Sequence, residues 1–273
     1  MKILFFRSIW GLEDIPALED KFKKIKAGGF DGIECDVPLD AATCKRARQV
    51  LDDLGLAVVA QQWRTSGQTV AEHTASFEPQ YERALSLQPL YLNSHTGRDH
   101  FTVEENLAIF DHASGLATKH GLEVYHETHR SRALFSIPAA MTFLAARPQL
   151  KLVADFSHWC CVHESLLADQ AERVECAIKH AFAIYARVGH PEGPQVPDPR
   201  DPLWQSQLEA HLAWWKQIIA LRRAEGCELL PICPEFGPAP YMTLLPHSHQ
   251  PIADLWEINC FMRDWLKEQL RIF

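Results

Sequence analysis

The sequence predicts a (β/α)8 barrel, a fold in which eight parallel strands, each followed by a helix, close into one domain. Three observations support this prediction. The chain has 273 residues, close to the roughly 250 that such a barrel uses. Eight short apolar segments alternate with segments of helical pattern, at a spacing of roughly 30 residues. No linker, low-complexity tract or block of charge divides the chain, so we expect one domain over residues 1–273.

The eight apolar segments are predicted to be buried parallel strands, because each is short and rich in Val, Ile, Leu or aromatic residues. They are residues 2–6, 29–35, 56–63, 90–95, 122–127, 150–155, 182–188 and 228–235. A doubly wound open sheet is the alternative, but it usually carries a glycine-rich phosphate loop after the first strand. Here that position reads FRSIWGLED and contains one glycine, so the closed barrel is favoured.

The helices between these strands are indicated by apolar spacings of three and four and by signals at their ends. Thr102 and Glu105 form the T-x-x-E pattern of a capping box, which predicts a helix that ends at His120. Glycines that would stop a helix before a strand stand at positions 29, 55, 121 and 226. The last helix is expected from about Pro251 to Ile272 and would complete the barrel.

Composition and charge exclude several classes of protein. The 47% of hydrophobic and 23% of charged residues are typical of a soluble globular protein. No apolar run approaches the roughly 18 residues of a membrane span, and the start of the chain lacks a signal-peptide cleavage site, so we expect a cytoplasmic location. The formal charge of −8 opposes non-specific binding to nucleic acid. The eight cysteines show no CxxC spacing and are expected to be free thiols.

Three of the predicted strands end in a carboxylate: Glu127 in YHETHR, Asp155 in VADFSHW and Glu235 in CPEFGP. The active site of this fold forms at the C-terminal ends of the strands, and strand alternation directs these side chains inward. A single carboxylate there would more often be a helix cap or a surface ion pair. Three that converge would repel one another without a cation. Oxygen ligands with an imidazole suit one divalent ion, Mn²⁺, Mg²⁺, Co²⁺ or Zn²⁺.

Glu127, the D-x-x-H motif formed by Asp155 and His158, and Glu235 in PEFG resemble the xylose isomerase-like barrel superfamily. The stretches HETHR, DFSHW, ARVGHPEGPQVPDP and PEFGP resemble most its bacterial sugar phosphate isomerase/epimerase branch. The resemblance covers the whole chain as a fold and is specific at these four stretches. It implies that Glu127, Asp155 and Glu235 hold one divalent metal ion. It also implies that the two glutamates form an acid/base pair and that His158 contacts a substrate oxygen.

The fourth ligand of that family is a histidine inside the seventh strand, and the matching position here is near Tyr185. Tyrosine is a poor substitute as a neutral ligand. We expect His190, which follows at the end of this strand, to serve as the fourth metal ligand, with Gly189 allowing it to turn inward. Gln195 is an alternative oxygen donor.

The predicted function is therefore a metal-dependent sugar or sugar phosphate isomerase or epimerase. Glu127 or Glu235 would remove a proton alpha to a carbonyl, the metal would stabilise the enediolate, and the other glutamate would return a proton. Arg187 and His95 are expected to bind the small carbohydrate substrate together with His158. A guanidinium at the mouth suits an anionic or polyhydroxylated molecule.

Several alternatives stay open. Epimerisation, isomerisation and dehydration of a polyol or keto-sugar use the same residues, since they differ only after the proton has left. An endonuclease IV-like phosphoester hydrolase would need two or three metals, with Glu34 and His95 as candidates for the additional ligands. A binding protein without activity is a further alternative, and the departure at Tyr185 is the best argument for it. The sequence selects neither the substrate nor the oligomeric state, although barrels of this group often form homo-oligomers.

Overall fold

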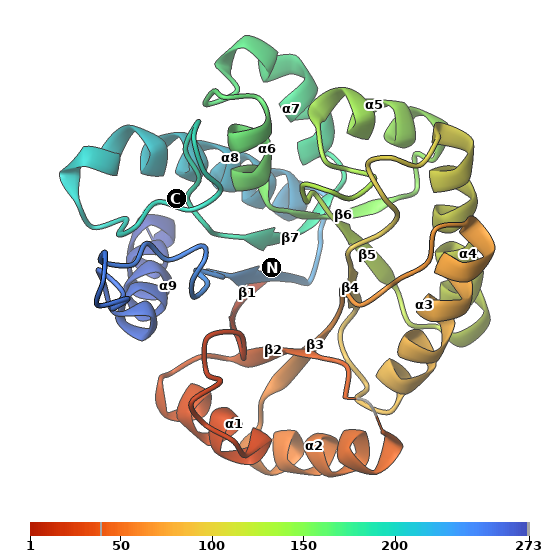
Figure 1. Cartoon of the computed structure of the whole chain (residues 1–273), viewed down its shortest axis with the longest axis horizontal. Helices are drawn as coiled ribbons and strands as arrows, with labels where there is room; N and C mark the ends of the chain where they lie inside the picture. The colour runs from red at the N-terminus through yellow and green to blue at the C-terminus, as the bar shows by residue number, and fades with distance from the viewer. Residues whose placement is uncertain (39, 272–273) are drawn as a thin grey trace.

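The computed structural model, which describes residues 1–38 and 40–271, contains a closed barrel of parallel strands in sequential order (Figure 1). The prediction of a (β/α)8 barrel is confirmed. The strands are β1 Lys2–Ser8, β2 Gly32–Asp36, β3 Ala57–Gln62, β4 Leu92–Ser94, β5 Val124–Glu127, β6 Lys151–Ala154, β7 Ala181–Tyr185 and β8 Leu229–Cys233. The barrel closes where β8 pairs in parallel with β1, with Leu230 opposite Ile3.

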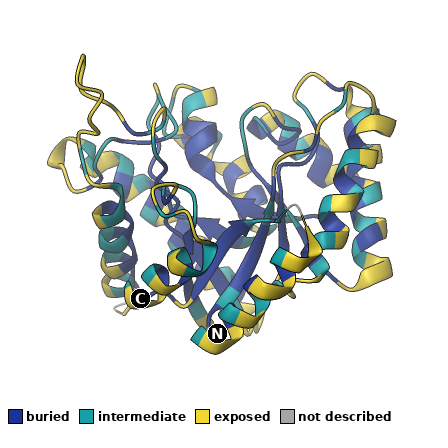
Figure 2. Ribbon diagram, turned by 60° about the horizontal axis from the view of Figure 1, so that its bottom comes forward, coloured by how far each residue is buried: buried dark blue, intermediate teal, exposed yellow. Residues whose placement is uncertain are grey.

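The helices surround the barrel and present their outer faces to solvent (Figure 2). They are α1 Leu18–Ala27, α2 Ala41–Leu54, α3 Val70–Leu85, α4 Val103–His120, α5 Ile137–Ala146, α6 Phe156–Val162, α7 Ala171–Ile178, α8 Gln205–Ala224 and α9 Leu255–Arg271, with 3-10 turns η1 Ala168–Gln170 and η2 Pro202–Trp204. Within the described residues, none of these helices has the length and apolar character needed to cross a bilayer. All eight cysteines are free thiols.

The predicted helix signals are found at the ends of α4. The side chain of Thr102 accepts a hydrogen bond from the backbone N–H of Glu105, whose carboxylate accepts one from the N–H of Thr102, so the capping box is complete. The helix ends at His120, and Gly121 follows in the left-handed conformation at φ 77°. Gly29, Gly55 and Gly226 also have positive φ.

The last helix begins at Leu255 rather than near Pro251. Pro251 instead forms an isolated bridge with Leu244 in the long β8–α9 loop, and this pairing holds the chain out of helical conformation. The expected end at Ile272 lies outside the described residues.

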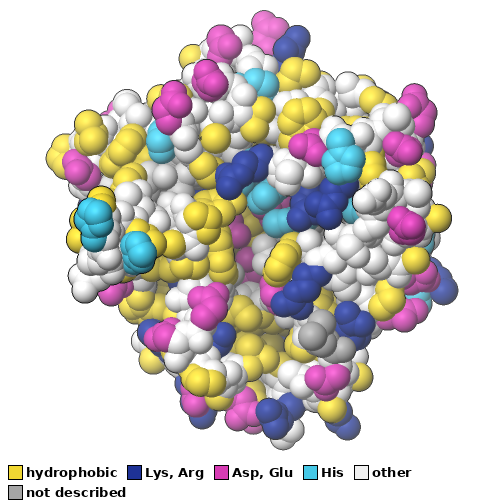
Figure 3. Space-filling view, viewed as in Figure 1, with side chains coloured by type: hydrophobic (Ala, Val, Ile, Leu, Met, Phe, Trp, Pro, Cys, Tyr) yellow, Lys and Arg dark blue, Asp and Glu magenta, His cyan; other side chains and the backbone are white. Residues whose placement is uncertain are grey.

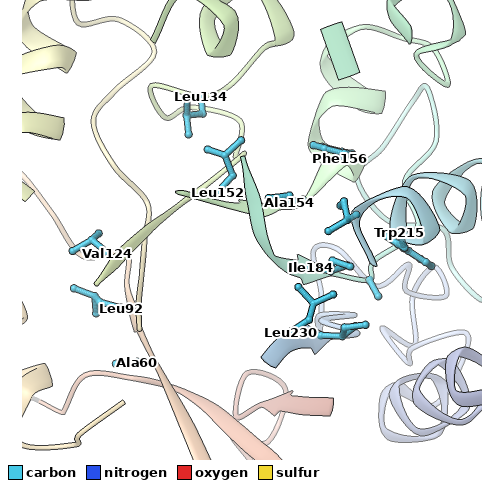
Figure 4. Close-up of a cluster of buried hydrophobic side chains, with 14 of the residues drawn as sticks. Ala60, Leu92, Val124, Leu134, Leu152, Ala154, Phe156, Ile184, Trp215 and Leu230 are labelled. Atoms are coloured by element: carbon cyan, nitrogen blue, oxygen red, sulfur yellow. The ribbon is translucent and has the colours of Figure 1, made fainter. Parts of the chain in front are cut away.

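Two layers of apolar side chains hold the barrel together. The inner layer fills the barrel with side chains from most of its strands: Leu4, Phe6, Val59, Tyr91, Val153, Ala183, Tyr185 and Cys233. The outer layer lies between strands and helices, and Figure 4 shows Ile184 and Leu230 of neighbouring strands near Trp215 of α8. His126 belongs to this outer side, since its ring packs 4.8 Å from that of Phe110 in α4. Successive side chains of a strand therefore point alternately inward and outward.

The strands stop where the predicted site residues begin. Strand β7 ends at Tyr185, before Arg187, and β8 ends at Cys233, before Glu235. Glu235 has φ 53°, which is incompatible with an extended strand. These side chains consequently lie just above the inner apolar layer, at the carboxyl ends of the strands.

Candidate active site

The carboxyl ends of the strands surround a cavity of about 590 Å³. Figure 3 looks onto this face and shows a central hollow with acidic, basic and histidine side chains around it. The buried part of the cavity wall is lined by strand-end residues with polar side chains: His95, Glu127, His129, Arg187 and Glu235. A cavity with a few convergent polar groups is the feature most typical of an active site.

Glu127 is held in place by two side chains, one from the neighbouring strand β4 and one from the residue that follows it. The amide of Asn93 donates to Oε2 of Glu127 at 2.7 Å, and Nε2 of His95 donates to the same oxygen at 2.9 Å. Burial raises the pKa of Glu127, but the interactions with His95, His129 and Asn93 outweigh it and lower the pKa to about 2. Glu127 is therefore ionised at neutral pH.

Arg187 lies at the centre of the other carboxylates. Its Nη2 forms an ion pair with Asp155, lies 3.5 Å from Oε2 of Glu235, and donates to Nε2 of His158 at 2.9 Å. Asp155 also caps α6 through the backbone N–H of Ser157. The helix-cap role that is common for such carboxylates thus coexists here with a buried ion pair.

The carboxylates outnumber the positive charge beside them. Burial raises the pKa of Asp155 to about 6 although Arg187 opposes this, and burial raises the pKa of Glu34 to about 8. Burial also raises the pKa of Glu235 well above its ordinary range, helped by the charge of Glu127 and opposed by Arg187. Oε2 of Glu235 has no hydrogen-bond partner among the described residues. Ionising these carboxyl groups together would place a surplus of negative charge in the site, and an additional cation would compensate for it.

Two groups of side chains could hold that cation. Glu127, Asp155 and His158 form one group, and His95, Glu127 and His129 form the other, with the ligand atoms of each group within 4.8 Å of one another. Burial lowers the pKa of His129 and of His158 well below the ordinary value, so both rings are neutral and can act as ligands. Carboxylates with neutral imidazoles are suitable donors for Mn²⁺, Co²⁺ or Zn²⁺, so the residues present fit a divalent ion.

Tyr185 occupies the position where the resemblance implies a histidine ligand. Its hydroxyl donates to the carboxylate of Glu34 on β2 and accepts from Asn93 at 2.6 Å. Because Asn93 also donates to Glu127, the phenol connects the second strand with the fifth across the barrel. Tyr185 is thus part of a hydrogen-bond network beneath the site.

The structure brings together all the predicted site residues except one: His95, Glu127, Asp155, His158, Arg187 and Glu235 are joined by the contacts above. His190 does not join them. Its backbone pairs with Gly193 in a turn, and its ring packs 5.0 Å from that of Trp204. The alternative donor, Gln195, uses both atoms of its amide on the backbone of Gly237. Neither belongs to the two groups that could bind a cation in the described part of the chain.

Sequence reasoning missed three participants. Asn93 stands two residues before His95 in YLNSH, so alternation could have placed both side chains on the inner face. His129 follows Glu127 by two residues in HETHR, and its ring lies between those of His95 and His158, at 4.4 and 3.9 Å. Glu34 was considered only as an additional metal ligand of a hydrolase. No sequence signal indicates its bond to Tyr185.

No family model and no curated protein matches this sequence. Solved structures of the same fold do. The chain resembles the 3-keto-D-glucoside 4-epimerase YcjR from E. coli, with 15% identity and a TM-score of 0.62 over 98% of this chain and 100% of that one. It also resembles the probable 3-DHS dehydratase AsbF from Bacillus anthracis, with 14% identity and a TM-score of 0.64 over 97% and 98% of the two chains.

A D-psicose 3-epimerase has the same fold, with 14% identity and a TM-score of 0.62 over 97% of this chain and 98% of that one. At such identities the likeness establishes the fold. The chain therefore has the same barrel fold as these enzymes.

Proposed function

We propose that this chain is a divalent-metal-dependent sugar isomerase or epimerase that removes the proton alpha to a carbonyl group. The observation that carries the proposal is a pair of buried glutamates, Glu127 and Glu235, on the wall of one cavity, whose pKa values are shifted in opposite directions by burial and by neighbouring charges. Environments that move two carboxyl pKa values apart are typical of acid/base pairs. With such a pair, one glutamate can accept the proton from the substrate and the other can return a proton to it.

Glu127, Asp155 and Glu235 would hold the metal ion, with His158 rather than His190 as the imidazole ligand. When bound, a divalent ion supplies a Lewis acid that polarises the substrate carbonyl and stabilises the enediolate. Asn93 and His95 fix the direction of the Glu127 carboxylate. Such positioning is needed because general acid–base catalysis requires the reacting groups within hydrogen-bond reach.

The neutral imidazoles and Arg187 provide the remaining polar contacts. His129 lines the cavity and can donate to or accept from a sugar hydroxyl, and Arg187 lines it beside Glu235. The structural neighbours support a carbohydrate substrate, since two of them are named as sugar epimerases. The dehydratase neighbour favours a second candidate, a lyase in which loss of a beta hydroxyl follows the same proton abstraction.

The experiment that tests this proposal combines metal analysis with proton exchange in D₂O. The purified protein is dialysed, loaded with Mn²⁺, Mg²⁺, Co²⁺ or Zn²⁺, and mixed with D-fructose, D-allulose, D-tagatose and their phosphates. We expect one bound equivalent of metal. We also expect metal-dependent incorporation of deuterium alpha to the carbonyl, which NMR detects. Elimination of water in the same spectra would indicate the lyase. Two or more equivalents with phosphodiester cleavage would favour the hydrolase, and protein without bound metal would contradict the proposal.

A further inference from the structure

The cavity continues beyond the charged residues toward the loops that follow β1, β2 and β3. We call this part the outer subsite, and its lining is largely apolar: Ile9, Trp10, Leu18, Val37, Pro38 and Trp63. Cavities of roughly 300–1,000 Å³ hold ligands of drug size. The whole cavity of about 590 Å³ therefore has room for more than one six-carbon sugar.

Trp63 forms an exposed but fixed wall of the outer subsite. The residue is 43% exposed, yet its indole N–H donates to Oδ1 of Asp36 at 2.8 Å. The guanidinium of Arg64 pairs with the other oxygen of Asp36 at 2.5 Å and lies 5.2 Å from the indole centroid. A large apolar ring held at the surface in one orientation is organised in advance for stacking.

Trp10 is fixed in a similar way on the loop after β1. The buried guanidinium of Arg7 donates to the carbonyl of Trp10 at 3.2 Å, and the N–H of Trp10 donates to the hydroxyl of Ser8. The indole packs edge to face with Tyr241 at 5.1 Å and lies so close to Gly237 that any β-carbon there would collide with it. Two tryptophans from different loops thus line the cavity.

The charges of the outer subsite do not favour an anion. Glu13 and Asp36 balance Lys21 and Arg64 among its lining residues, and Arg64 is already paired with Asp36. A phosphate group would gain little net attraction there. An uncharged group with an apolar face and hydroxyls at its edge matches the lining better.

We propose that the outer subsite binds a second ring joined to the reacting sugar, so that the substrate is an unphosphorylated glycoside whose reacting sugar carries a ketone at a carbon other than the glycosidic one. This inference rests on the proposed function for the sugar ring at Glu127 and Glu235. The second ring can be a glycosyl unit, whose C–H face stacks on an indole, or an aromatic aglycone. Lys21 is half-buried at the cavity wall and can donate to a hydroxyl of that ring.

Calorimetric titration of the metal-loaded protein tests the proposal. The probes are D-glucose, D-galactose and D-mannose, their p-nitrophenyl glycosides, cellobiose, and glucose 6-phosphate. We expect a p-nitrophenyl glycoside or cellobiose to bind at least about fivefold tighter than its parent sugar. Tighter binding of the nitrophenyl glycosides alone would indicate an aromatic aglycone, and tighter binding of cellobiose would indicate a second sugar.

Substitution of the tryptophans should remove this preference. In Trp10→Ala and Trp63→Ala the ratio of the two affinities should fall toward one, and Trp63→Phe should restore most of it. Trp204→Ala is the matched control, since Trp204 packs against His190 away from the cavity lining, and it should keep the ratio of the wild type.

Two readouts separate the failure of the subsite from the failure of the proposed function. Three results would overturn the outer subsite. The first is a ratio of affinities near one for every pair of glycoside and parent sugar, and the second is a ratio that both alanine substitutions leave unchanged. The third is tighter binding of glucose 6-phosphate than of glucose. None of these results bears on proton exchange with free ketoses. A ratio that depends on the tryptophans, without exchange at any alpha carbon, would support the subsite and overturn the proposed chemistry.

Discussion

Arg187 and Asp155 form an ion pair in which the side chains are only 2% and 0% exposed. The same guanidinium nitrogen lies 3.5 Å from a carboxylate oxygen of Glu235. One buried cation is thus shared between two carboxylates, while the raised pKa of Glu34 shows that burial leaves a further carboxyl without a compensating charge. The stability of the site and its affinity for a metal ion should therefore both depend on Arg187.

Arg187→Met should destabilise the protein and make its stability more dependent on metal. Removal of one partner from a buried ion pair typically costs about 3–5 kcal/mol. Added Mn²⁺ should recover more unfolding free energy in the variant than in the wild type, because the ion compensates the carboxylates that lost the guanidinium. Urea denaturation with and without Mn²⁺ measures both effects.

Arg200→Met is the control for this experiment. Arg200 pairs with Asp198 at 2.7 Å, with the arginine side chain 36% exposed, and pairs of that kind contribute at most about 1 kcal/mol. Equal losses in the two variants, or an equal response to Mn²⁺, would contradict the central role given to Arg187.

Glu127→Gln and Glu235→Gln should each lower turnover by at least about a hundredfold, since general acid–base catalysis contributes roughly 10²–10⁴-fold. Glutamine retains an oxygen that can coordinate a metal but cannot exchange the proton. Asp155→Asn should recover much of its activity in excess Mn²⁺, because Asp155 is assigned only to holding the metal. Deuterium incorporation alpha to the carbonyl is the measurement, and rapid incorporation by both glutamine variants would assign the proton transfer to other residues.

The protein should lose stability on acidification because of His126. Burial lowers the pKa of His126 to about 3, whereas in the unfolded chain it is about 6.5. Between these values the unfolded state binds the additional proton, so the unfolding free energy falls as pH decreases from about 6.5 toward 3. Between about pH 7 and pH 5 this one residue should account for a loss of about 2 kcal/mol.

Urea denaturation of His126→Gln at both pH values checks this assignment. The difference in unfolding free energy between the two pH values should be smaller in this variant than in the wild type. In His100→Gln it should equal that of the wild type, because the His100 side chain is 67% exposed. An unchanged pH dependence in His126→Gln would assign the effect to other groups.

Gly189→Ala should damage the site, whereas Gly115→Ala should not. A β-carbon at position 189 would lie 2.6 Å from the backbone oxygen of Ser157, and Ser157 binds both Asp155 and Arg187. A β-carbon at position 115 would meet no atom within 4 Å, and alanine in a helix is more stable than glycine by about 0.5–1 kcal/mol. Thermal unfolding and metal binding of the two variants test the contrast, and equal behaviour would contradict it.

The sequence predicts the barrel well because local patterns determine it. Each strand is a short apolar run, and the carboxylates at 127, 155 and 235 follow from the alternation of those runs. His190 could not be placed by the same reasoning. Gly189 is required for close contact with Ser157 rather than for a turn inward, and that contact joins segments far apart in the chain. The bond from Tyr185 to Glu34 is likewise long-range, between residues 151 positions apart.

Glu235 adopts the left-handed backbone conformation with φ 53°, and it does so with a buried carboxyl side chain. A non-glycine residue in that conformation costs on the order of 1–3 kcal/mol, and glycine would relieve this cost. Selection for thermal resistance alone should therefore enrich glycine at position 235, whereas selection for turnover should retain glutamate. The residue found at position 235 in a population of variants should therefore show whether that population was selected mainly for stability or mainly for activity.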